Sequence, residues 1–85
     1  LSAMGKNQIA EKYFDRAIEI FYELRLPEDI AEVYYNRSLN YIMQERYAEA
    51  EHDLLSAMKV IETGQDWKIA ALRSSFHVHF LFWRN

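Results

Sequence analysis

Residues 10–21 read AEKYFDRAIEIF, and forty positions further along residues 50–61 read AEHDLLSAMKVI. Both segments carry alanine at their first and eighth positions, and a large apolar residue at their fifth and twelfth positions. Apolar residues spaced three and four apart share one face of an α-helix. This internal repeat therefore predicts two equivalent amphipathic helices, with small residues where helices approach closely and large ones in the space between helix pairs.

The helical periodicity extends over four runs that are joined by short breaks. We expect helices over residues 7–25, 27–43, 47–62 and 66–83, with residues 1–6 forming either a tag or the end of a preceding helix. Asn7 is suited to cap the first helix, and Pro27 suits the first position of the second helix because its φ angle is already helical. Short connections make neighbouring helices antiparallel. The sequence thus predicts a single all-α domain of antiparallel helix pairs.

The amino-acid composition limits which kinds of binding partner and which cellular compartment are expected. The 85 residues are 51% hydrophobic, carry a net charge of −3 and include no cysteine. Without a basic cluster the chain is not expected to bind nucleic acid. The longest nearly uncharged stretch, residues 74–83, is shorter than the roughly 18 residues that span a bilayer, so no membrane association is expected. We expect a soluble, cytoplasmic protein that is stabilised by packing alone.

Side chains that could carry chemistry do not form a recognisable site. His77 and His79 are two residues apart, so on a helix they point in different directions and cannot share a metal ion. Most carboxylates fall on solvated helix faces, and His52 lies between Glu51 and Asp53 on such a face. We therefore expect no catalytic residue, no metal ligand and no cofactor, and the chain is not expected to be an enzyme.

Residues 33–41, VYYNRSLNY, followed by Tyr47, Ala50, Leu54 and Ala57, resemble a tetratricopeptide repeat. Ser38 stands at the small-residue position of that repeat and Tyr41 at its aromatic position. The resemblance covers half a repeat, one full repeat and the first helix of a third. The spacing of forty differs from the usual period of about 34 residues. It is similar to that of bacterial peptide-sensing regulators and of some animal scaffold proteins with such repeats.

The resemblance implies a concave groove, lined by the first helix of each pair, that binds a peptide or helical segment of another protein. The residues expected to line this groove are Glu32, Tyr35, Asn36, Leu39, Met43 and Arg73. Asn36 and Arg73 also resemble positions of a clamp that binds a terminal carboxylate in chaperone-binding repeats. The lysine position of that clamp falls at Ile69.

The last run is apolar on nearly every side and needs cover from another helix or another copy. We expect a self-association surface, and with it a possible homodimer, from Phe76, Phe80, Leu81, Phe82 and Trp83. Three functions stay open at this point: a peptide-binding interaction module, a peptide-pheromone-sensing regulator of bacterial type, and a structural fragment that dimerises or swaps its last helix.

Overall fold

The computed structural model describes residues 3–62 and 67–84, with side-chain surroundings described from residue 8 onward except at 67–69, 80 and 82–84. Four helices make up the described part of the chain: α1 (Ala3–Glu23), α2 (Pro27–Met43), α3 (Tyr47–Glu62) and α4 (Trp67–Arg84). No strand occurs within these residues. The expected all-α fold of packed helix pairs is therefore confirmed.

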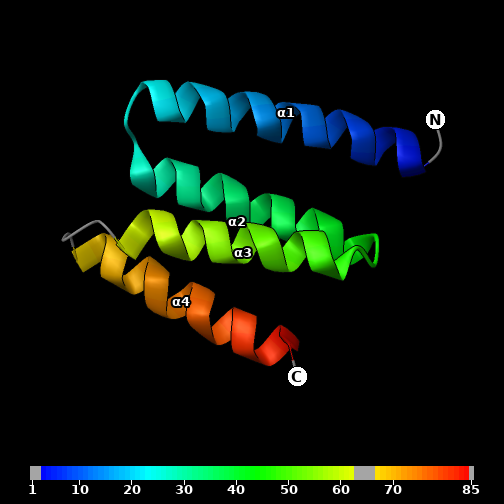
Figure 1. Cartoon of the computed structure of the whole chain (residues 1–85). Helices are drawn as coiled ribbons and strands as arrows, with labels where there is room; N and C mark the ends of the chain where they lie inside the picture. Colours follow the sequence, from blue (N-terminus) through cyan, green and yellow to red (C-terminus); the bar gives the residue numbers. More distant parts are fainter. Residues whose placement is uncertain (1–2, 63–66, 85) are drawn as a thin grey trace.

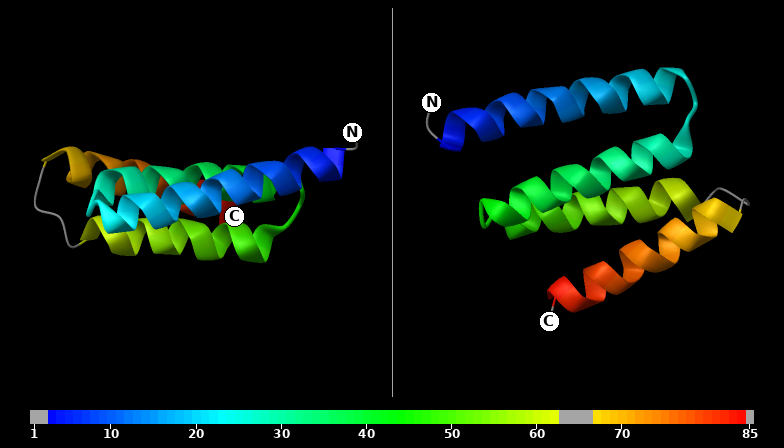
Figure 2. Two further views of the ribbon diagram at one scale, coloured as in Figure 1. Left: turned by 90° about the horizontal axis from the view of Figure 1, so that it is seen from above. Right: turned by 180° about the vertical axis from the view of Figure 1, so that it is seen from behind.

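The helices lie side by side in chain order, each antiparallel to the one before it, so that α1 and α4 form the two edges (Figure 1). The view from behind shows the same order (Figure 2). The molecule measures 42 × 34 × 15 Å along its principal axes. Among the four helices that the structure describes, α2 and α3 have a neighbouring helix on both sides.

The beginning of α1 differs from expectation. The helix starts at Ala3, so Asn7 lies inside it and the cap assigned to Asn7 is wrong. In contrast, Pro27 occupies the first turn of α2, followed by Glu28 and Asp29, whose negative charges favour the positive end of the helix dipole. Residue 66, where the last run was expected to begin, lies outside the described residues.

The two short connections share one backbone geometry. Arg25 and Glu45 both have positive φ angles, of 57° and 59°. The amide of Arg25 donates to the carbonyl of Tyr22, and the amide of Leu26 donates to that of Phe21. Glu45 and Arg46 repeat this pattern on α2. Such paired bonds are the helix-ending Schellman motif, here built with residues other than glycine. The motif turns the chain back sharply, which places successive helices antiparallel.

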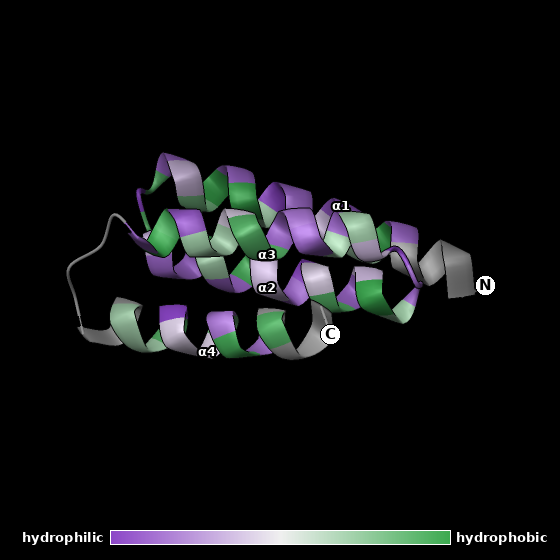
Figure 3. Ribbon diagram, turned by 60° about the horizontal axis from the view of Figure 1, so that its bottom comes forward, coloured by the Kyte–Doolittle hydropathy of each residue, from purple (hydrophilic) through white to green (hydrophobic). Residues whose placement is uncertain are grey.

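The core lies between α2, α3 and α4. Ala31, Ala57, Ile61 and Phe76 form one buried cluster, with Leu72 packed against it. Ser38, Ala50 and Leu54 are also buried. Small residues thus occupy the close approach of α2 and α3, as the repeat predicts. Figure 3 shows that hydrophilic and apolar residues are interspersed along the coloured parts of the helices, as in amphipathic helices.

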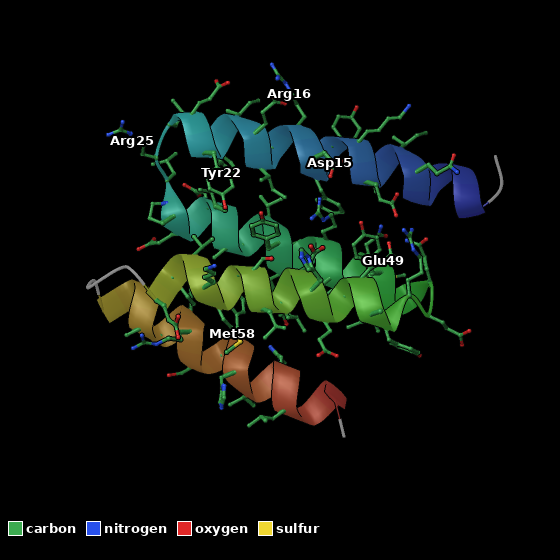
Figure 4. All side chains as sticks on the ribbon, in the orientation of Figure 1. Asp15, Arg16, Tyr22, Arg25, Glu49 and Met58 are labelled. Atoms are coloured by element: carbon green, nitrogen blue, oxygen red, sulfur yellow. The ribbon has the colours of Figure 1, made fainter. Side chains whose placement is uncertain are left out.

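An arginine from α2 ties three helices together. Nε and Nη2 of Arg37 each lie 2.7 Å from an oxygen of Asp53 on α3, a bidentate arrangement. Nη1 of Arg37 also donates to Asp15, which points from α1 toward α2 in Figure 4. Asp53 is only 1% exposed. The expectation that Asp53 lies on a solvated face is therefore wrong, because the arginine of another helix compensates its charge.

Two further polar contacts join α1 to the rest of the molecule. Arg46, at the connection between α2 and α3, pairs with Glu11 of α1 and with Glu49 of α3. Tyr34 of α2 lies near Tyr22 of α1, which contributes to raising the pKa of Tyr34. The side chains by which α1 faces its neighbours are half-buried rather than buried. The attachment of α1 therefore combines half-buried side chains with the ion pairs of Asp15 and Glu11.

The Tyr34 hydroxyl gives this attachment a measurable pH dependence. Burial, together with the neighbouring hydroxyl of Tyr22, raises the pKa of Tyr34 to about 12. A group with a raised pKa in the folded state stabilises that state fully below its unfolded pKa of about 10, and loses this contribution as the pH rises through the folded value. We expect the ultraviolet absorbance of tyrosinate to show a last titration step near pH 12 that disappears in Tyr34→Phe but persists in the control Tyr13→Phe. Complete ionisation of all tyrosines near pH 10 would contradict this expectation.

Candidate interaction surface

The exposed face of α2 carries a continuous stripe of four residues whose spacing of four, three and four keeps them on one side of the helix. We call it the α2 stripe; its members are Glu32, Asn36, Leu39 and Met43, and all four are exposed. Leu39 is 42% and Met43 82% exposed. Large apolar side chains gain free energy when they leave water, so this stripe is suited to contact with another molecule.

Tyr35 borders the α2 stripe and connects it to α4. Its ring stacks on that of Phe76 with centroids 4.7 Å apart and an interplanar angle of 21°. Its hydroxyl lies 2.8 Å from Nδ1 of His79 and is hydrogen-bonded to it. Burial raises the pKa of Tyr35. Tyr35 is half-buried, and its contacts with Phe76 and His79 position α4 beside α2, although Tyr35 was expected among the groove residues.

His79 was not expected at this place. Its role follows from its position three residues after Phe76, which puts both rings on the side of α4 that faces α2. That spacing is visible in the sequence, but it identifies His79 only once Phe76 is known to face inward. Within the part of the chain that the structure describes, no group of three or more histidine, aspartate or glutamate side chains could hold a metal ion.

Arg73 does not join the α2 stripe. It lines a pocket of about 380 Å³ between α3 and α4, together with Met58, Glu62, Ser74 and His77. The structure therefore does not bring Arg73 next to Asn36, and the two residues do not form the halves of one carboxylate clamp. The side chain of Ile69, at the lysine position of that clamp, lies outside the described residues.

Of the five residues expected to form a self-association surface, the structure describes the side chains of Phe76 and Leu81. Phe76 is 3% exposed and belongs to the core, so it has to be removed from that surface. Leu81 is exposed, as is its neighbour on the helix Val78. The side chains of Phe80, Phe82 and Trp83 lie outside the described residues. None of the helices in the described ranges is long and apolar enough to cross a membrane.

Comparison with known proteins agrees with this architecture. The model of the tetratricopeptide repeat family matches residues 1–63, which include α1, α2 and α3. No curated protein and no solved structure matches the chain. Because the match covers more than half of the chain, the protein belongs to the tetratricopeptide repeat family. Repeats of this family are interaction modules that bind other proteins, and they are typically non-enzymatic. In these terms α2 and α3 are one repeat, and α1 is the second helix of the repeat before it.

Proposed function

We propose that this protein binds a peptide or helical segment of a partner protein along the α2 stripe. The observation that carries the proposal is the exposure of Leu39 and Met43 on the same face as the amide of Asn36. The two apolar side chains offer contact area, and methionine adapts to differently shaped partners because its side chain is unbranched and flexible. Asn36 can both donate a hydrogen bond to a peptide backbone and accept one from it.

The stripe also suggests which segment fits. Met43 lies eleven positions after Glu32, a helical rise of about 16 Å, which an extended chain of about five residues covers. Glu32 supplies a negative charge at one end, whereas Leu39 and Met43 supply an apolar surface at the other. The preferred segment therefore has a basic residue near Glu32 and one or two apolar residues near Leu39 and Met43.

The matched pair Leu39 and Leu55 allows a direct test. Both leucines are similarly exposed, at 42% and 46%, but Leu39 lies on α2 and Leu55 on α3. Peptides selected from a displayed random library against the native chain are expected to lose at least about tenfold in affinity for Leu39→Asp, because a charge would be buried in an apolar contact. Leu55→Asp should bind them as the native chain does.

A second substitution examines the polar part of the contact. Asn36→Ala is expected to weaken the selected peptides by about 1–3 kcal/mol if the amide bonds to their backbone. Lys59→Ala, an exposed change on α3, is its control. Peptides that tolerate both Leu39→Asp and Asn36→Ala, or that respond equally to Leu55→Asp, would show that the α2 stripe is not the binding surface.

A further inference from the structure

His79 of α4 turns one of its two ring nitrogens toward α2 and the other away from it. The Tyr35 hydroxyl lies 2.8 Å from Nδ1 of His79, and the centroids of the two rings are 5.3 Å apart. His79 is nevertheless an exposed residue. Because the two nitrogens of an imidazole point in different directions, the bond at Nδ1 leaves Nε2 available to another molecule.

The chemistry of Tyr35 favours its hydroxyl as the donor of this bond. Burial raises the pKa of Tyr35, so the hydroxyl keeps its proton at neutral pH. A half-buried hydroxyl that does not donate leaves its hydrogen unpaired, which costs free energy, and Nδ1 of His79 lies within hydrogen-bond distance. A neutral imidazole whose Nδ1 accepts a hydrogen bond carries its own hydrogen on Nε2. Tyr35 thereby selects the tautomer of His79 that offers an outward N–H donor.

The position of this donor is fixed by packing. Tyr35 stacks on Phe76 with ring centroids 4.7 Å apart, and Phe76 is only 3% exposed. His79 follows Phe76 by three residues, so both rings lie on the same side of α4. A side chain that is held in place by its neighbours loses little conformational entropy when it binds a ligand. The Nε2 donor is therefore suited to recognition.

His79 lies beside the α2 stripe. Its hydrogen-bond partner Tyr35 directly precedes Asn36, which is a member of that stripe, and Tyr35 borders the stripe on the side of α4. An extended peptide carries hydrogen-bonding groups along both of its edges. A peptide on the α2 stripe that uses one edge to contact Asn36 therefore turns its other edge toward α4 and His79.

We propose that His79 extends the binding surface from α2 onto α4, by donating a hydrogen bond from Nε2 to a backbone carbonyl oxygen of the bound peptide. Tyr35 acts as the positioning residue. This inference rests on the function proposed above, since it concerns the same peptide. Asn36 on α2 and His79 on α4 then hold the two edges of one extended segment, which sets its direction across the surface.

Two amide replacements of His79 separate binding from packing. The glutamine amide reaches about as far from the backbone as Nε2, whereas the shorter asparagine amide reaches only about as far as Nδ1. For the peptides selected against the native chain, we expect His79→Ala and His79→Asn each to lower the affinity about tenfold, because the outward donor is lost. His79→Gln should stay within about threefold of the native affinity. His77→Ala is the matched control, because His77 lines the pocket between α3 and α4, and it should bind as the native chain does.

Tyr35→Phe tests the positioning role. The substitution keeps a ring that can stack on Phe76 but removes the hydroxyl. Nitrogen NMR spectra of the neutral imidazole are expected to show the His79 hydrogen on Nε2 in the native chain, and a mixture of both tautomers in Tyr35→Phe. A tyrosine that only packs would leave the tautomer unchanged when its hydroxyl is removed. Circular dichroism spectra check that each variant keeps its helices.

Several results would overturn the role of His79 while leaving the α2 stripe intact. One is a loss of affinity in Leu39→Asp together with native affinity in both His79→Ala and His79→Asn. Another is a hydrogen on Nδ1 of His79 in the native chain. A third is an effect of His79→Ala that is confined to peptides with a carboxylate side chain, because the backbone carbonyl would then not be the acceptor. Native affinity in Leu39→Asp would instead contradict the function proposed for the α2 stripe itself.

Discussion

Arg37→Ala is expected to lower the free energy of unfolding by about 3–5 kcal/mol, because it leaves the buried carboxylate of Asp53 without its counter-charge. Both oxygens of Asp53 accept hydrogen bonds from Arg37, and these bonds raise the pKa of the guanidinium above its ordinary value. The substitution also removes the link from α2 to Asp15 of α1. Urea unfolding followed by circular dichroism measures the loss.

Two variants separate this effect from a general loss of ion pairs. Arg16→Ala breaks the exposed pair with Glu19 and should change the free energy of unfolding by less than about 1 kcal/mol, because exposed pairs contribute little. The double replacement Arg37→Met/Asp53→Leu removes both buried charges and should be less destabilised than Arg37→Ala alone. An Arg37→Ala protein as stable as the Arg16→Ala protein would contradict the role assigned to Arg37.

Phe76→Ala is expected to cost about 3–5 kcal/mol, since it removes a buried ring from the centre of the contact that holds α4. Tyr35 loses its stacking partner at the same time, although His79 can still reach its hydroxyl. Because α4 is an edge helix, we expect it to detach first. Thermal unfolding and hydrogen exchange of the α4 amides together measure this loss.

Val78→Ala is the matched control on the same helix. Val78 is exposed, so the substitution should change the free energy of unfolding by about 0.5 kcal/mol or less. The comparison also distinguishes a core role for Phe76 from a role in self-association. If Phe76→Ala changed the oligomeric state while leaving the unfolding curve of the monomer intact, the core assignment would be wrong.

The fold could be predicted largely because its determinants are local. Helical periodicity and the proline at position 27 act over a few residues, and a single sequence displays them directly. The small residues at 50 and 57 were recognisable because they recur forty positions after those at 10 and 17. The positive φ angles of Arg25 and Glu45 could not be recognised in the sequence, since helix ends of this kind usually carry glycine.

The surroundings of individual side chains were harder to predict, because they depend on other helices. Asp53 looks solvated when α3 is considered alone, and only Arg37 of α2 makes its burial favourable. The inward direction of Phe76 and the separation of Arg73 from Asn36 follow from how α4 rotates against α3, which sequence spacing does not determine. Glu32, Asn36, Leu39 and Met43 are exposed on one face of α2, and their role in binding stays a prediction.

The contrast between the buried small residues and the α2 stripe has a consequence for evolution. Ala31, Ser38, Ala50 and Ala57 have no exposed surface, and any larger side chain there would push helices apart. Glu32, Asn36, Leu39 and Met43 face solvent, so substitutions among them leave the spacing of the helices intact. Descendants of this chain can therefore acquire new binding preferences by point mutation while natural selection keeps the scaffold beneath them nearly constant.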